Sequence, residues 1–130
     1  MPFLPREHAE KYALERDEHL RVERFRNAFA LIRQLNPSMS GNLVECLLLV
    51  TLKPGGGPTD YAKDLEVTSG QVSRWMLELG ERARDGGDGH GLIQRLGGST
   101  DLREVHYTLT PKGKAMMKKF SEKLGVGIHG

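Results

Sequence analysis

Apolar and polar residues alternate along the segment between residues 91 and 113, which is the period of a half-buried β-strand. A short apolar pair at residues 92–93 precedes a glycine-containing turn signal at 97–99, and a second alternating stretch follows. The apolar members of that second stretch are Val105, Tyr107 and Leu109. The pattern predicts a two-stranded hairpin with a charged tip around residues 101–103.

Two short helices are predicted directly before this hairpin, at residues 58–67 and 68–83, with a tight turn at 67–70 between them. Thr68 and Gln71 have the spacing of a capping box, in which each side chain hydrogen-bonds the backbone N–H of the other residue. The second helix also has one apolar stripe at positions i, i+3, i+4 and i+7. The stripe consists of Val72, Trp75, Met76 and Leu79.

The opposite face of this second helix is small and mostly polar. It carries Gly70, Ser73, Arg74 and Leu77, with Ser69 and Gln71 at its leading end. Small residues let a helix lie close to a nucleic-acid backbone, while an arginine and an amide can reach base edges. A face that is merely solvated would look similar, so the helix alone favours neither interpretation.

A single long helix is predicted from about Pro5 to Leu35, because this span has no glycine or proline inside it. Its second half has an apolar stripe that a domain of this size cannot bury by itself. We therefore interpret the helix as a dimerisation arm, and the alternative is a surface helix with a frayed start. The residues expected to form the dimer contact are Val22, Phe25, Phe29 and Ile32, together with Met116 and Phe120 of the last helix.

The remaining elements complete a mainly α-helical plan with a small β-hairpin wing. Residues 41–52 are almost entirely apolar and predict a central core helix, and a last helix is expected from Pro111, with Thr110 as its N-cap, to Leu124. The expected fold class is a winged helix-turn-helix with long N-terminal and C-terminal dimerisation helices. The expected divisions are a dimerisation helix (1–39), a winged helix-turn-helix DNA-binding domain with the C-terminal helix (40–124) and a tail (125–130).

This order of elements and residues resembles the MarR family of winged-helix transcription regulators over roughly residues 40–120. The matching positions are Thr59, Leu65, Val72, Ser73, Arg74, Leu79, Gly91-Leu92-Ile93, Arg95, Asp101, Arg103, Leu109-Thr110 and Lys112-Gly113. The resemblance implies a homodimer on double-stranded DNA, with each recognition helix in a major groove and each wing at the flanking minor groove. Arg74 matches the recognition-helix arginine, Arg103 the wing arginine and Asp101 the aspartate that positions the wing. The chain departs from the family in its long glycine-rich link at residues 80–91, whose role the sequence leaves open.

The expected function is therefore a sequence-specific DNA-binding transcription regulator, expected to repress. The residues expected to contact DNA are Lys63, Thr68, Ser69, Gln71, Ser73, Arg74, Arg95, Ser99, Thr100, Asp101 and Arg103. The alternative is a winged-helix protein–protein interaction module without DNA binding. The net charge of only +2 favours this alternative, because phosphate binding needs clustered positive charge.

Enzymatic chemistry is not expected, and the sequence predicts neither a metal site nor a cofactor. The five histidines are scattered without metal-ligand spacing, and the glycines at 55–57 lack the residues that follow in a phosphate-binding loop. Cys46 has apolar neighbours, so we expect it to be buried and inert rather than redox-sensing. A single cysteine, no signal peptide and no membrane-length apolar run indicate a cytoplasmic protein that does not bind a membrane.

The resemblance also raises the question of a small-molecule effector. The sequence offers four apolar residues as candidates to line an effector crevice, but no arginine or histidine placed to hold an anion. The four are Phe29, Leu48, Met116 and Phe120. Core packing is the favoured role of these four residues. We therefore expect no tight response to small aromatic carboxylates.

Overall fold

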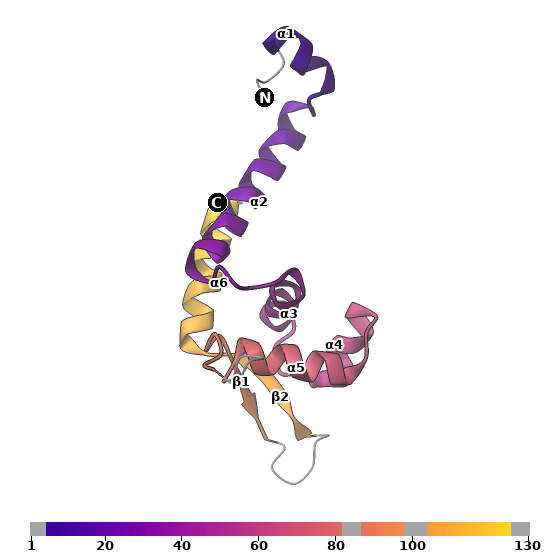
Figure 1. The fold of residues 1–130 in the computed structure, drawn as a ribbon, viewed down its shortest axis with the longest axis vertical. Coiled ribbons are helices and arrows are strands. Elements are labelled where there is room, and N and C mark those ends of the chain that lie inside the picture. The colour runs from indigo at the N-terminus through magenta and orange to yellow at the C-terminus, as the bar shows by residue number, and fades with distance from the viewer. Residues whose placement is uncertain (1–4, 82–86, 98–103, 126–130) are drawn as a thin grey trace.

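The computed structural model describes residues 5–81, 87–97 and 104–125, and within them the chain is mainly helical with one β-hairpin (Figure 1). This is the predicted fold class. In chain order the elements are α1 (Arg6–Ala9), the 3-10 helix η1 (Glu10–Tyr12), α2 (Arg16–Leu35), α3 (Gly41–Leu52), α4 (Pro58–Leu65), α5 (Ser69–Leu79), β1 (Ile93–Leu96), β2 (His106–Leu109) and α6 (Pro111–Leu124).

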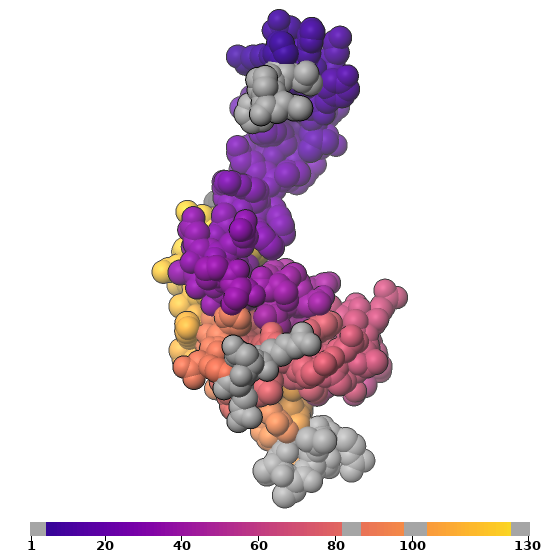
Figure 2. All heavy atoms as spheres, in the orientation of Figure 1, coloured from indigo at the N-terminus to yellow at the C-terminus, as the bar shows by residue number. Residues whose placement is uncertain are grey.

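Helices α2 and α6, far apart in sequence, pack side by side (Figure 1). Ala28 and Ile32 of α2 are fully buried, and Met116 and Phe120 of α6 are almost fully buried. The pair therefore belongs to the same core as the rest of the chain. By contrast, α1 and the first half of α2 stand away from this body (Figure 2).

The predicted continuous helix from Pro5 to Leu35 is wrong, because the chain is interrupted before residue 16. Ala13 is extended, and the backbone N–H of Glu15 donates to the carboxylate of Glu18 at 3.1 Å, which caps a new helix. No side chain of α1 or η1 is buried, so tertiary packing does not hold this stretch to one helix.

Helix α3 is the central core helix, with the predicted bounds. Ser40 caps it by accepting from the backbone N–H of Leu43 at 3.3 Å. Five of its side chains are buried, namely Leu43, Val44, Cys46, Leu47 and Val50. Burial raises the pKa of the Cys46 thiol to about 12, which keeps it protonated. Burial of Cys46 thus agrees with its expected inertness.

Helices α4 and α5 form the predicted helix-turn-helix, with Glu66 in the left-handed region (φ 58°) between them. The second helix was expected to reach residue 83, but it ends at Leu79. The chain beyond it turns back, and the N–H of Leu92 donates to the carbonyl of Leu79 at 2.7 Å. A Cβ on Gly80 would lie 2.8 Å from the carbonyl oxygen of Ile93, so only glycine permits this approach.

The hairpin pairs β1 with β2 in antiparallel register, from Ile93 opposite Leu109 to Leu96 opposite His106. The α3–α4 linker lies along the other edge of β2. There the N–H of Gly55 donates to the carbonyl of Tyr107 at 2.8 Å, and the N–H of Tyr107 donates to the carbonyl of Gly56 at 2.9 Å. The linker thus fixes the hairpin to the helical core.

Candidate nucleic-acid interface

Helix α5 is held at both ends and along one side. The N–H of Thr68 donates to Gln71 Oε1 at 3.1 Å, and the N–H of Gln71 donates to Thr68 Oγ1 at 3.2 Å. These two bonds confirm the predicted capping box. Val72, Met76 and Leu79 are buried, and Trp75 packs partly buried against the core. The opposite side of α5 is therefore presented to solvent on a rigid element.

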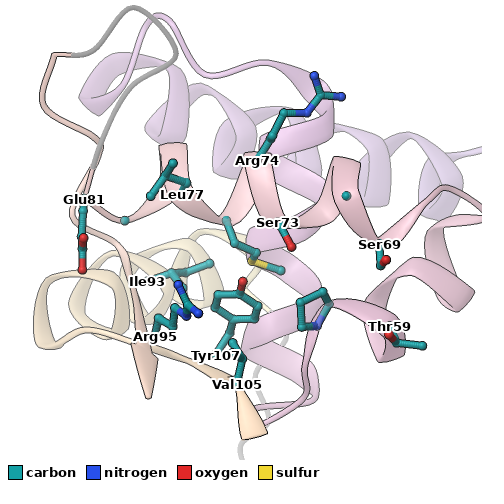
Figure 3. Close-up of a pocket in the computed structure, with 14 residues that line it drawn as sticks. Thr59, Ser69, Ser73, Arg74, Leu77, Glu81, Ile93, Arg95, Val105 and Tyr107 are labelled. Carbon is teal, nitrogen blue, oxygen red and sulfur yellow. The ribbon is translucent and has the colours of Figure 1, made fainter. Parts of the chain in front are cut away.

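That opposite side, the outer face of α5, consists of Ser69, Gly70, Ser73, Arg74 and Leu77, all exposed. Arg74 makes no hydrogen bond or ion pair with any residue that the structure describes, and Figure 3 shows it extended away from the body of α5. Leu77 keeps 45% of its surface exposed although it is apolar. A free guanidinium and an exposed leucine side by side suit a partner that offers acceptors and methyl groups.

A groove of about 610 Å³ separates α5 from the hairpin (Figure 3). Met76, Ile93 and Val105 contribute apolar lining, and Ser73 and Arg95 stand on opposite sides of it. The Tyr107 ring lies in this groove with its hydroxyl directed toward Ser73 (Figure 3).

Burial raises the pKa of Tyr107 from its ordinary value, and the nearby Ser73 hydroxyl and Arg95 only partly offset that effect. The phenol is therefore neutral at physiological pH, and Arg95 lies near it at the groove. The groove thus has an apolar lining with polar and positively charged groups near its edges.

The predicted DNA-contacting residues are distributed over three regions. Ser69, Ser73 and Arg74 lie on the outer face of α5, Lys63 is exposed on α4, and Arg95 lines the groove. Thr68 and Gln71 are engaged in the capping box, which leaves the Gln71 amide group NH₂ without a capping role. Ser99, Thr100, Asp101 and Arg103 lie outside the described residues.

The sequence did not indicate Tyr107 as part of this surface. Its place in the alternating strand pattern predicts burial, which is correct. The Tyr107 hydroxyl reaches the groove because of the way α5 packs against β2. Strand periodicity carries no information about that packing.

The predicted dimer-contact residues separate into two groups. Val22 and Phe25 are 58% and 49% exposed, and Phe29 is half-buried with its ring centroid 6.0 Å from that of Phe25. Ile32, Met116 and Phe120 are instead buried inside the chain, so the expectation that Ile32 belongs to an exposed stripe is wrong. They are buried because α2 and α6 pack on each other.

Within the described residues, no group of His, Cys, Asp and Glu is arranged to hold a metal ion. None of the described helices is long and apolar enough to cross a membrane.

No protein-family model matches the sequence, and neither does any curated protein. Solved structures do match. RV1404 from Mycobacterium tuberculosis is similar with a TM-score of 0.61 at 20% identity, over 95% of this chain and 76% of that one. The transcriptional repressor CouR, bound to a 23-mer DNA duplex, is similar with a TM-score of 0.56 at 21% identity, over 97% of this chain and 81% of that one. Wild-type MarR from E. coli, in its apo form, has a TM-score of 0.54 at 18% identity, over 96% of this chain and 80% of that one.

The chain has the MarR-like winged-helix fold. Helices α4 and α5 form the helix-turn-helix of this fold, and the β1–β2 hairpin stands in the position of the wing. The outer face of α5 and the groove beside it therefore form the candidate nucleic-acid interface.

Proposed function

We propose that this protein is a non-enzymatic transcription regulator that binds specific double-stranded DNA sequences as a homodimer and represses. The observation that carries the proposal is the outer face of α5, on a rigidly capped helix beside a wing hairpin. There Arg74 stands among small residues and pairs with none of the residues in the described ranges. The DNA-bound state of CouR, a protein of the same fold, supports it.

The shape of the outer face fits the major groove, which is about 12 Å wide and admits an α-helix. The helix surface carries short side chains at Ser69, Gly70 and Ser73, so the helix backbone could approach the DNA closely. Arg74 has five N–H donors and bonds to no residue that the structure describes, which suits the paired acceptors of a guanine edge. Leu77 would contact a thymine methyl group.

Exposed basic side chains also lie on α4, β1 and α6, and no ion pair to a carboxylate engages them within the residues that the structure describes. Lys63 on α4 and Arg95 on β1 are exposed, and so are four lysines of α6. The four are Lys112, Lys114, Lys118 and Lys119. For the wing we propose that Arg103 approaches the minor groove, that Asp101 positions the wing, and that Ser99 and Thr100 contact the backbone.

The dimer would form through the arm, residues 1–39, whose exposed Val22 and Phe25 leave apolar surface in water. Residues 40–124 would bind DNA, with residues 125–130 as a tail. Because α2 and α6 share one core with the helix-turn-helix, movement of the arm would be transmitted to α5.

A salt titration of duplex binding tests the proposal. A duplex selected from a random pool should bind with a log affinity that falls linearly with log salt, since each neutralised phosphate releases a counterion. Absence of duplex binding at low salt would refute the proposal and favour the protein–protein interaction module instead. The control is Lys11→Ala, in the arm, which should leave the salt slope unchanged.

A further inference from the structure

A polar junction connects the arm to the end of the recognition helix. Asn36 follows the last residue of α2, and its Oδ1 lies 3.1 Å from Nδ1 of His90, which is 54 positions further along the chain. Both residues are half-buried. We call this pair the Asn36–His90 junction.

The junction is tied to two further helices. The backbone N–H of His90 donates to the carbonyl of Glu78 at 2.9 Å, in the last turn of α5. The carbonyl of His90 accepts from Nζ of Lys112 at 3.0 Å, in the first turn of α6. On the other side, Nδ2 of Asn36 donates to Sδ of Met116 at 3.5 Å. One imidazole thus stands where α2 ends, α5 ends and α6 begins.

The chemistry of the two side chains determines which ring nitrogen of His90 carries the hydrogen. The carboxamide Oδ1 of Asn36 only accepts, so Nδ1 of His90 carries the hydrogen. Burial lowers the pKa of His90, with a further lowering from Lys112 and an opposing effect from Glu78. The link therefore operates with a neutral imidazole of defined tautomer.

We propose that the Asn36–His90 junction positions the recognition helix relative to the α2–α6 pair, and thereby selects the half-site spacing that the homodimer accepts. The inference rests on the proposed function. In a dimer joined through the arms, a rotation of α5 against α2 changes the separation of the two recognition helices. That separation must match successive major grooves, about 34 Å apart. Asn36 and His90 would act through α5 without touching DNA, so they are positioning residues.

The test compares variants on duplexes that differ only in half-site spacing. The probe is the duplex selected from a random pool by the wild-type protein, with one base pair inserted or deleted at its centre. Asn36→Ala and His90→Ala each remove one side of the junction and leave the backbone bonds of His90 intact. Asn36→Asp keeps an acceptor for the imidazole N–H. Gln34→Ala, which removes an exposed amide two residues away, is the matched control.

We expect the wild type, Asn36→Asp and Gln34→Ala to prefer the selected spacing. Asn36→Ala and His90→Ala should lower this preference about fivefold or more, while each single half-site is bound as in the wild type. Melting curves establish that each variant is folded.

An unchanged spacing preference in Asn36→Ala and His90→Ala would overturn the inference, even if their affinity or melting temperature fell. So would a wild type that binds DNA with no spacing preference, and in both cases the proposed DNA-binding function would stand. A wild type that binds no duplex would instead refute the proposed function, and the inference with it.

Discussion

Two exposed helix surfaces of this molecule have opposite chemistry. The outer face of α5 is small and polar, apart from Leu77, and water solvates it well. The first half of α2 exposes Val22 and Phe25, which water solvates poorly. The two surfaces therefore fit the two proposed partners differently: double-stranded DNA for α5, and the apolar arm of a second copy for α2.

The second half of α2 is covered by another helix of the same chain, whereas the first half is not. The same apolar stripe continues to Ala28 and Ile32, and both are fully buried because α6 covers them. Helix α6 ends at Leu124, and the first half of α2 stands clear of the body (Figure 2). Half of the apolar stripe is thus buried within the chain, and the proposed contact with the arm of a second copy would bury the other half.

The largest expected effect comes from placing charge on this stripe. Val22→Glu combined with Phe25→Glu should convert a dimer into a monomer, with dimer affinity reduced about 100-fold or more, because the apolar contact would have to bury two carboxylates. Sedimentation measures the change. Leu52→Glu is the matched control, since Leu52 is also apolar and 76% exposed, but at the end of α3. Dimers that persist in the double variant, or a monomeric wild type, would disprove the arm's role.

The next effect concerns the exposed guanidinium of Arg74 on α5. Arg74→Ala should cost about 1–3 kcal/mol on the selected duplex and much less on a scrambled one, because a bidentate pair with guanine would be lost. Arg74→Lys keeps the charge without the planar pair of donors, so it should restore non-specific binding but not the preference. Competition binding against both duplexes gives the two affinities. If Arg74→Ala lowered both affinities equally, Arg74 would be a phosphate contact rather than a base contact.

Where caps and periodicity are local, the sequence predicted the structure well. Helices α3 and α6 have their expected bounds, because Ser40 and Thr110 cap their first turns and Gly125 ends α6 in the left-handed region. The hairpin was predicted from alternation and a turn signal, which are both local features of the sequence. The capping box of α5 was readable from two residues.

One error has a local cause: the Glu15–Glu18 cap starts a new helix where a continuous one was predicted. The other errors lie where distant segments decide the outcome. Helix α5 stops at Leu79 because the chain returning at Leu92 takes up its last carbonyl, a contact across thirteen positions. Ile32 was expected on an exposed stripe, but it is buried because α2 and α6 pack on each other. The groove beside Tyr107 likewise exists only once α5 and β2 are assembled.

A smaller effect is expected from replacing two glycines by alanine, each in the first turn of a helix. The two substitutions should differ in their effect on duplex binding. A Cβ on Gly41 of α3 would meet nothing within 4 Å, and one on Gly70 of α5 would meet only Thr68 Oγ1 at 4.0 Å. Neither fold position requires glycine, so alanine at either should raise the free energy of unfolding by up to about 1 kcal/mol.

Only Gly70 lies on the proposed DNA-contacting face, where an added methyl group would hold the helix away from DNA. Gly70→Ala should therefore weaken duplex binding about tenfold while raising the melting temperature, whereas Gly41→Ala should raise the melting temperature alone. Thermal melting and duplex titration on both variants provide the comparison. Equal DNA affinities in the two variants would show that the outer face of α5 does not approach DNA closely at Gly70.

The smallest expected effect is a pH dependence of stability that arises from His90 in the Asn36–His90 junction. Burial lowers the pKa of His90 in the folded protein, so the unfolded chain, with a histidine pKa of about 6.5, binds the proton more readily. The contribution of neutral His90 to stability is therefore fully present above about pH 6.5. It is lost as the pH falls through that value toward the lower pKa of His90 in the folded protein. His90→Gln removes the titrating group and keeps an amide N–H that can donate to Asn36 Oδ1.

Between about pH 7.5 and pH 5.5 the melting temperature of the wild type should fall by about 2 °C more than that of His90→Gln. The effect is small because His90 is only half-buried and Glu78 favours its charged form. The difference between the two proteins isolates His90, since every other titrating group is common to both. Parallel pH profiles would mean that His90 is solvated as freely in the folded protein as in the unfolded chain, which would contradict its burial at the end of α2.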